Sequence, residues 1–416
     1  MEIYLVGGAV RDKLLNYPVK ERDWLVLGET PEAMIQKGFR PVGKDFPVFL
    51  HPESQEEYAL ARTERKTAPG YKGFIIHAAP DVSLEQDLIR RDLTINAMAM
   101  TPEGIIQDPF GGQQDLEKRI LRHISPAFAE DPVRILRVAR FAARYGHLGF
   151  TLAEETRALM HSMVTAGEVD HLVPERVWAE LLKALHEQTP SAFFQTLKCC
   201  GALAKIFPEI DRLFGVPQPE KYHPEIDTGV HVMLCLQQAV LLSNNAEVRF
   251  AVLVHDLGKG VTPREEWPHH HGHEHTGLAA LDALCERLRV PKSFKSLARL
   301  VMRYHTQCHR VFELRASTLT DLLIALGAFK NDNNRLAEFL LACEADARGR
   351  TGLELKPYPQ VDFVRMAAQA AAVIDVSDIL GRVIEGPKIG ETIRNDRIKA
   401  VSEAIKNYKS AEKTAV

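Results

Sequence analysis

The feature that most constrains this sequence is its first 23 residues, where an apolar run, a glycine pair and two spaced carboxylates follow one another. Residues 3–6 are expected to form a short buried strand. The pair Gly7-Gly8 then lets the backbone turn tightly and approach a ligand closely. A helix that starts after such a turn presents backbone amides to an anion, and Arg11 can add a bidentate contact. The stretch therefore predicts a phosphate-binding turn that includes Gly8.

Two carboxylates, Glu21 and Asp23, stand at the start of a second expected strand, residues 23–27. Because side chains alternate along a strand, residues two positions apart point to the same face. Carboxylates placed in this way repel each other unless a divalent cation lies between them, and Mg²⁺ is the expected species. An isolated E-x-D is usually a solvated surface pair, so it is the glycine turn upstream that favours the metal interpretation.

Length and composition indicate several domains in a protein of ordinary globular character. The chain has 416 residues, too many for one core, with 45% hydrophobic and 26% charged residues. The sequence contains no apolar run long enough for a membrane span, and its six cysteines show no C-x-x-C spacing. We therefore expect a cytoplasmic protein with free thiols and no membrane partner. With a net charge of −3, nucleic-acid binding would require a local basic stripe.

Further candidates follow in the first third of the chain. Residues 56–62 are strand-like, and residues 63–73 form either a loop that closes over a substrate or a passive hairpin end. Residues 84–100 have helical periodicity and include Arg90-Arg91-Asp92. Arg91 is a candidate for contacting a triphosphate.

An arginine stripe is expected on a helix over residues 132–144, where arginines recur at spacings of three, three and four: Arg134, Arg137, Arg140 and Arg144. A solvated basic face is the common interpretation of such a stripe. The absence of acids on the stripe, together with Asp131 at the helix start, favours an anionic ligand instead.

Histidines crowd residues 223–309, within a total of 17. The adjacent pair His255-Asp256, with His231 before it and Asp346 after it, predicts a metal site on a helical scaffold. Histidine and carboxylate ligands suit Zn, Ni, Mn or Fe better than Mg. Lys259 is a candidate for binding phosphate, and four further histidines are second candidates as ligands: His271, His273, His275 and His305.

These motifs together resemble the bacterial class II tRNA nucleotidyltransferases, which are the CCA-adding enzymes. Within that family they most resemble the gammaproteobacterial type, which has an appended HD phosphohydrolase domain. The resemblance runs in order through nearly the whole chain. It is carried by the glycine turn, the spaced carboxylates, the histidine region and three runs: Arg90 to Ala97, Asp108-Pro109-Phe110-Gly111-Gly112, and Glu130-Asp131-Pro132-x-Arg134-x-x-Arg137.

The resemblance implies an α+β fold with a polymerase-β-like nucleotidyltransferase head, a mixed sheet with helices. An all-α neck, an HD-type helical domain and a helical tail would follow. The implied domains are residues 1–115, 116–200, 201–350 and 351–416. We expect a monomer, with a homo-oligomer as the alternative.

The implied reaction is attack of the tRNA 3′-hydroxyl on the α-phosphate of CTP or ATP, with loss of pyrophosphate. Glu21 and Asp23 would be the catalytic Mg²⁺ ligands, and Asp131 and Arg134 would read the incoming base. The other implied nucleotide contacts are Gly8, Arg11, Arg91, Arg137 and Arg140. The HD domain implies phosphatase, 2′-nucleotidase and 2′,3′-cyclic phosphodiesterase activities with a transition metal, Ni²⁺ among the candidates.

One departure stands out, because the family pattern is Asp-x-Asp and this chain has Glu21 at the first position. The added methylene moves the carboxylate by ~1.5 Å on a fixed backbone. A misplacement of that size can cost about 10²-fold in rate. Either transfer is weakened or the backbone has adjusted. Two alternative functions stay open: a related poly(A) polymerase, and a tRNA-end phosphohydrolase whose head only binds RNA.

Overall fold

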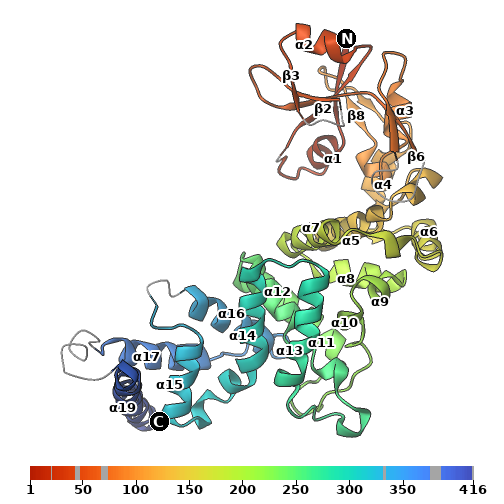
Figure 1. Cartoon of the computed structure of the whole chain (residues 1–416). Helices are drawn as coiled ribbons and strands as arrows, with labels where there is room; N and C mark the ends of the chain where they lie inside the picture. Colours follow the sequence, from red (N-terminus) through yellow and green to blue (C-terminus); the bar gives the residue numbers. More distant parts are fainter. Residues whose placement is uncertain (20, 43–46, 67–73, 331–333, 375–385, 415–416) are drawn as a thin grey trace. The chain divides into compact units, whose positions relative to one another are not determined.

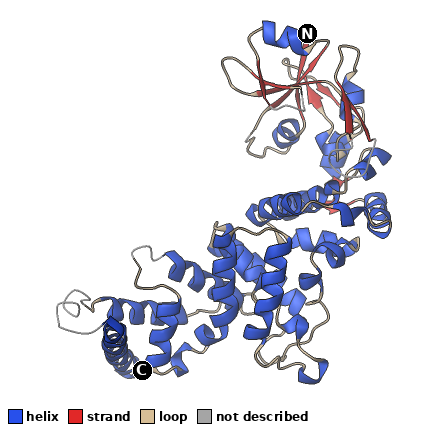
Figure 2. Ribbon diagram, viewed as in Figure 1, coloured by secondary structure: helices blue, strands red, loops and turns tan. Residues whose placement is uncertain are grey.

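The computed structural model describes residues 1–19, 21–42, 47–66, 74–330, 334–374 and 386–414 (Figure 1). The chain divides into two compact units, Met1–Ile206 and Phe207–Val416. All strands of the described residues lie in the first unit, and the second is helical (Figure 2). This arrangement confirms the predicted α+β class. All six cysteines are free thiols, as predicted.

A mixed sheet of seven strands forms the centre of the first unit, in the order β3-β4-β5-β2-β1-β8-β9. The central strands β2 and β5 are parallel, and all other neighbours in the sheet are antiparallel. The strand bounds are β1 (Glu2–Val6), β2 (Asp23–Leu27), β3 (Arg40–Val42), β4 (Val48–Leu50), β5 (Glu57–Leu60), β8 (Ala99–Met100) and β9 (Ile106–Gln107). The strands expected near residues 3–6, 23–27 and 56–62 are therefore confirmed.

Strand β2 is buried on both faces, which explains its continuous apolar sequence. Leu25 packs in a cluster with Val6 and Leu88, whereas its neighbour Val26 packs in a second cluster with Met34. Both β2 side chains are 1% exposed. Because successive side chains point to opposite faces, the two clusters cover opposite sides of the sheet. The strand that begins with Asp23 is therefore held rigidly.

The prediction of a helix over residues 84–100 was wrong. Helix α3 spans only Leu84–Leu88, and a 3₁₀ turn (Thr94–Asn96) and strand β8 follow. The buried carboxylate of Asp92 accepts hydrogen bonds from the backbone N–H of Leu93 at 2.9 Å and from Nδ2 of Asn96 at 2.8 Å. Side chains that bond to nearby backbone groups compete with the helix. The apolar residues that follow are buried in the sheet core.

Strands β6 (Thr63–Lys66) and β7 (Phe74–His77) form an antiparallel hairpin that precedes residues 84–100 in the sequence. The loop expected to close over a substrate falls largely on residues 67–73, which lie outside the described residues. The helix expected over residues 132–144 is confirmed as α5 (Val133–Tyr145). Amphipathic spacing also predicts helices over residues 151–167 and 174–185, and these are confirmed as α6 (Glu154–Thr165) and α7 (Pro174–His186). The remaining elements of the first unit are α1 (Gly8–Leu14), α2 (Pro31–Gln36), α4 (Gly112–Lys118), β10 (Ile120–Leu121), β11 (Thr151–Leu152), α8 (Ser191–Cys199) and α9 (Ala202–Ile206).

The second unit is a helical bundle in which α14 packs against α12, α13 and α16, and α11 packs against α12 and α16 (Figure 1). The bounds of these helices are α11 (Thr228–Leu242), α12 (Ala246–Val254), α13 (His273–Arg287), α14 (Lys292–His309) and α16 (Asn334–Arg348). The other α-helices that the structure describes in this unit are α10 (Pro208–Asp211), α15 (Ala316–Ala325), α17 (Gln360–Ala372) and α19 (Gly386–Thr414). Among the described helices, none is both long and apolar enough to cross a membrane.

In the tail, the run Gly386-Pro387-Lys388-Ile389-Gly390 combines glycine with proline and predicts a break in a helix. The structure instead assigns the whole run to helix α19 (Gly386–Thr414). The break predicted at these residues is therefore wrong.

Candidate functional site

A cavity of about 740 Å³ in the first unit gathers every predicted residue of the nucleotide site. Strand pairing explains why the turn and the carboxylates meet, because Val6 of β1 pairs with Asp23 of β2. The glycine turn that follows Val6 is thus at the same end of the sheet as the carboxylates. The predicted residues that line the cavity are Gly8, Arg11, Glu21, Asp23, Arg91, Asp131, Arg134, Arg137 and Arg140.

The glycine turn needs glycine at its first position. Gly7 has φ 68°, in the left-handed region, and a Cβ built on it would lie 2.7 Å from Nη1 of Arg91. Arg91 therefore packs directly over the turn. The guanidinium of the buried Arg11 donates from Nε to Asp12 at 2.8 Å and from Nη1 to Asn96. The turn is thus flanked by two arginines that are fixed by their neighbours.

The carboxylates face the same cavity from different backbone settings. Asp23 is the first residue of β2, whereas the exposed Glu21 precedes the strand. Desolvation raises the pKa of Asp23, Arg91 opposes this effect, and the charge of Glu21 adds to it. This pair of carboxylates fits a divalent cation. The cation would offset the cost of desolvating the Asp23 anion and the repulsion between Asp23 and Glu21.

The arginine stripe of α5 is paired with acids from other elements. Arg137 donates from Nε to Asp92 at 2.7 Å, and Arg140 donates from Nε to Glu180 at 2.6 Å. Arg144 donates from Nη2 to Asp12 at 2.7 Å. The stripe is neither a solvated face nor a set of unpaired charges, because acids from α1, from α7 and from the segment between α3 and β8 balance it. The arginines still line the cavity.

Asp131 and Arg134, the residues expected to read the base, contact different neighbours in the structure. Arg134 donates to the backbone carbonyls of Ala127 at 2.9 Å and Arg90 at 2.7 Å. The partner of Asp131 is Arg176 of α7, which donates to its two oxygens at 3.2 and 2.8 Å. The sequence did not identify Arg176, since it lies 45 positions from Asp131 on another helix. Both members of the expected pair nevertheless line one cavity.

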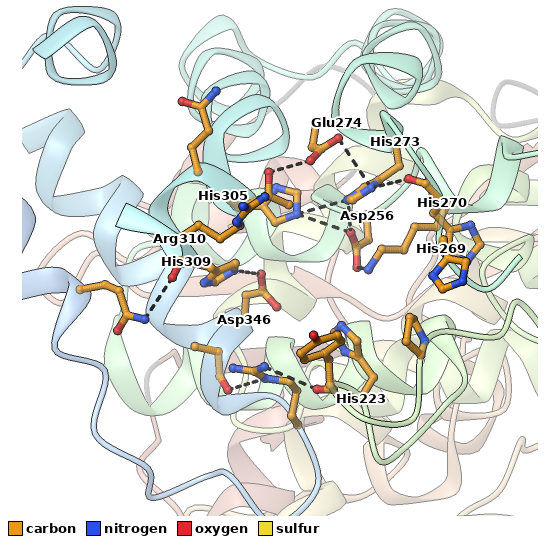
Figure 3. A pocket seen from close by; sticks show the side chains of 18 of the residues that line it. His223, Asp256, His269, His270, His273, Glu274, His305, His309, Arg310 and Asp346 are labelled. Atoms are coloured by element: carbon orange, nitrogen blue, oxygen red, sulfur yellow. Dashed lines mark hydrogen bonds and ion pairs between the residues drawn. The ribbon is translucent and has the colours of Figure 1, made fainter. Parts of the chain in front are cut away.

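A second cavity, of about 1160 Å³, lies in the second unit and is lined by histidines and carboxylates (Figure 3). Asp256 follows α12, and His273 is the first residue of α13. His305 and His309 come from α14, and Asp346 comes from α16. Helices from well-separated parts of the sequence therefore supply the polar groups of one site.

One set of donor atoms in this site consists of Nε2 of His231, Nε2 of His255 and Oδ1 of Asp346. Oδ1 of Asp346 lies 3.1 Å from Nε2 of His231 and 3.6 Å from Nε2 of His255. On the other side of each ring, Nδ1 of His231 lies 2.9 Å from the carboxylate of Glu225, and Nδ1 of His255 lies 2.7 Å from the carbonyl oxygen of Val252. These contacts place a proton on Nδ1 of each ring and leave Nε2 facing the carboxylates, which is the arrangement of a metal-ligating histidine.

This first donor set fits a metal cation. Nε2 of His255 is buried and makes no hydrogen bond within the described part of the chain. Burial lowers the pKa of His255, but the carboxylates of Asp256 and Asp346 outweigh it and raise the pKa to about 10. A positive charge is therefore strongly favoured between these groups. A metal ion can supply that charge in place of a proton.

A second donor set surrounds Oδ1 of Asp256 (Figure 3). Nε2 of His273 and Nε2 of His305 are 3.4 Å apart, and Oδ1 of Asp256 is 3.4 and 3.7 Å from them. Nδ1 of His273 faces the carbonyl of His270 at 3.0 Å, and Nδ1 of His305 faces that of Val301 at 3.0 Å. Three acceptors thus converge, and they too fit a cation. Of the other second candidates, His271 and His275 are exposed and belong to neither set.

Lys259 is held inside the cavity, where Nζ donates to Asp256 at 2.7 Å and to Gln218 at 2.6 Å. Sequence analysis missed Glu225, which fixes the ring of His231, and His309. Nε2 of His309 lies 2.7 Å from Oδ2 of Asp346. The spacing of four between His305 and His309 on one helix was a signal that could have identified the second.

Comparison with family models assigns three segments. The Poly A polymerase head domain matches residues 3–122, and the HD domain matches residues 228–327. Between them, residues 149–214 match a family described as "Probable RNA and SrmB- binding site of polymerase A".

Solved structures with similar folds share about a fifth of the sequence. A CCA-adding enzyme in complex with ATP has a TM-score of 0.64 at 20% identity, covering 97% of this chain and 88% of that chain. The Thermotoga maritima CCA-adding enzyme complexed with tRNA has a TM-score of 0.62 at 18% identity, covering 99% and 91%. At these identities the likeness shows the fold.

Curated relatives are far more similar. The multifunctional CCA protein of Methylococcus capsulatus is 64% identical over 96% of this chain and 94% of its own length. That of Nitrosococcus oceani is 61% identical over 97% of this chain and 99% of its own length. The two cavities, the fold and this near full-length identity agree, and the chain belongs to the multifunctional CCA protein family.

Proposed function

We propose that this chain adds and repairs the 3′-terminal CCA of tRNA with CTP and ATP, and that its second cavity hydrolyses phosphate esters. The observation that carries the first activity is one cavity that combines two carboxylates, a glycine turn and arginines from several elements. Membership of the multifunctional CCA protein family supports both activities. Because the substrate is tRNA, we assign the protein to the cytoplasm.

In the first cavity, Gly8, Arg11 and Arg91 hold the triphosphate, and Glu21 with Asp23 hold Mg²⁺. When bound, Mg²⁺ favours the deprotonated 3′-hydroxyl and stabilises charge on the leaving pyrophosphate. The arginines neutralise the phosphates and fix the nucleotide for in-line attack. Arg137 and Arg140 contribute positive charge at the neck side of the cavity, each steadied by a buried acid.

Base selection belongs to Asp131 and Arg134 in this proposal. A carboxylate offers only acceptors and a guanidinium only donors, so together they can complement the Watson–Crick edge of cytosine or adenine. Arg176 holds the carboxylate of Asp131 in the structure. Reading a base therefore requires that Arg176 either release Asp131 or share it.

In the second cavity, His231, His255, Asp256 and Asp346 hold a divalent transition metal, for which Ni²⁺ is a candidate. When bound, such a metal polarises the phosphate and lowers the pKa of a bound water. His273 and His305 supply further ligands on Asp256, so one or two ions fit the donor atoms. Lys259 neutralises a phosphate oxygen from the cavity wall.

The domain division that accompanies this function is a head (1–115), a neck (116–200), an HD domain (201–350) and a tail (351–416). The boundary between the two compact units, Ile206/Phe207, lies close to the proposed end of the neck. We propose a monomer as the active form. Sedimentation equilibrium at working concentration tests that assignment.

One assay separates the proposed activity from its alternatives. The full chain is incubated with tRNA lacking CCA, labelled CTP and ATP, and Mg²⁺. Ordered addition of C, C and A is the expected result. Tails of A alone with open length would indicate a poly(A) polymerase. No incorporation, with intact cleavage of a 2′,3′-cyclic phosphate, would leave only the phosphohydrolase function.

A further inference from the structure

A stripe of basic residues follows one face of α14, away from the histidine cavity. Its members recur at spacings of three, four and four, which keeps them on one side of the helix: Lys292, Lys295, Arg299 and Arg303. The opposite side of α14 is buried and includes Leu297, Val301 and His305. The helix therefore presents its metal-ligand candidate and its basic stripe on different faces.

The stripe borders a cavity of about 890 Å³, to which two more cations contribute, Lys330 and Arg335. We call these six residues the α14 surface: Lys292, Lys295, Arg299, Arg303, Lys330 and Arg335. The same cavity is also lined by the half-buried Tyr304, whose ring lies 5.5 Å from the guanidinium of Arg303. Nothing in the proposed chemistry of either catalytic cavity uses this surface.

Acids balance only half of the charge of the α14 surface. Asp282 pairs with Lys295 at 2.9 Å and with Arg299. Arg335 pairs with Glu247 at 3.1 Å and Glu338 at 3.0 Å.

The other three cations, Lys292, Arg303 and Lys330, have no acidic partner within the described part of the chain. Since the whole chain has a net charge of −3, this excess of positive charge is local.

We infer that the α14 surface binds the phosphate backbone of the RNA substrate, an inference that rests on the proposed function. The stripe on α14 extends ~17 Å at the rise of an α-helix, long enough for several phosphates of one strand. Cations at intervals along such a length match a regular polyanion better than a single small anion. Tyr304 adds an aromatic surface that can stack on a sugar or a base.

The test compares two triple variants of the full chain for tRNA binding as a function of salt. One variant carries Lys292→Ala, Arg303→Ala and Lys330→Ala. The control carries Lys118→Ala, Lys205→Ala and Arg365→Ala, which removes the same charge from scattered exposed positions. We expect the first variant to bind tRNA roughly tenfold more weakly at moderate salt. Its slope of log K against log salt should decrease by about 2 to 3 in magnitude, the signature of lost phosphate contacts. The control should keep the wild-type slope.

Two further measurements keep the result decisive. Lys292→Arg with Lys330→Arg preserves the charge and should preserve affinity and slope, which separates charge from folding. An equal loss of tRNA affinity in both triple variants, or no loss in either, would overturn the inference that the α14 surface binds RNA. Unchanged tRNA binding with weaker binding of poly-glutamate would assign the surface to an acidic protein and overturn the inference. If the wild type fails to add C, C and A while the first triple variant still loses tRNA affinity, the proposed function fails and the surface stands.

Discussion

At the scale of single residues, the departure at Glu21 is less severe than the sequence pattern suggests. Glu21 and Asp23 are both exposed, but Glu21 precedes β2, whereas Asp23 is the first residue of this strand, whose middle residues are buried on both faces. The longer side chain can therefore adjust without strain in the sheet. We expect Glu21→Asp to change the rate of CMP incorporation less than about tenfold, and Asp23→Ala to lower it by about 10² or more. Single-turnover incorporation into tRNA lacking CCA measures both, and a large gain from Glu21→Asp would contradict this account.

A buried carboxylate makes the stability of the first unit depend on pH. Burial alone would raise the pKa of Asp92, but Arg137 and the hydrogen bond from Asn96 outweigh it and hold the pKa well below its ordinary value. A group with a depressed folded pKa stabilises above its unfolded pKa of about 4 and loses that contribution as the pH falls further.

We therefore expect Asp92→Asn to reduce the free energy of unfolding by about 2 kcal/mol at pH 7. The difference from wild type should shrink below pH ~4, because Asp92 of the wild type then binds a proton in the unfolded state but not in the folded state. Chemical denaturation from pH 3 to 7 measures this. A difference that stays constant through the acid range would show that Asp92 acts through shape and not through charge.

The residues that could be predicted from the sequence are those whose roles follow from local spacing. Glu21 and Asp23 are two positions apart at a strand start, and His255 and Asp256 are adjacent. Partners that meet only through tertiary packing could not be predicted in this way. Arg176 reaches Asp131 from 45 positions away, and Glu225 fixes His231 from a loop before its helix. No periodicity along the chain marks such pairs.

At the scale of elements, the same limit appears in the segment over residues 84–100. Its apolar spacing indicates a helix, yet α3 ends at Leu88 because Asp92 bonds to nearby groups and because the following residues enter the sheet. Helices α5, α6 and α7 were predictable, since each is amphipathic and packs along one face. The structure of residues 84–100 is thus determined by burial in the sheet core, whereas the structure of α5, α6 and α7 follows from their local amphipathic pattern.

Helix α7 also suggests a role for Arg176 in nucleotide choice. The guanidinium of Arg176 donates to both oxygens of Asp131, the proposed base-reading carboxylate. Without that contact, Asp131 would keep the hydrogen bond from the backbone N–H of Val133 to Oδ1 at 3.0 Å but would lose the partner of Oδ2. We expect Arg176→Ala to raise the KM for CTP and ATP and to increase misincorporation of UTP several-fold, with a smaller effect on kcat.

The matched control for Arg176→Ala is Lys183→Ala on the same helix, which lines the same cavity but pairs with Glu180. It should leave nucleotide choice unchanged. Equal misincorporation by both variants would show that loss of charge in the cavity, and not the contact with Asp131, causes the effect. Arg176→Lys keeps the charge but not the contact with both oxygens of Asp131, so it should restore nucleotide choice only partly.

At the scale of the whole molecule, the two candidate sites belong to different compact units, each with its own core. Because neither cavity includes residues of the other unit, loss of one site should not impair the chemistry of the other. We expect His255→Ala to abolish 2′,3′-cyclic phosphodiesterase activity and to leave CCA addition within about twofold of wild type. Asp23→Ala should do the reverse.

Metal removal extends the same argument, because the two sites offer different ligands. Carboxylates alone in the first cavity favour Mg²⁺, whereas imidazoles with carboxylates in the second favour a transition metal. After chelation, Mg²⁺ alone should restore CCA addition but not cyclic phosphodiesterase activity, and Ni²⁺ in small excess should restore the latter. Metal content after dialysis should fall in His255→Ala and stay unchanged in Asp23→Ala. Recovery of both activities with Mg²⁺ alone would mean that the histidine site does not select a transition metal, even though its buried nitrogen atoms converge on Asp256 and Asp346.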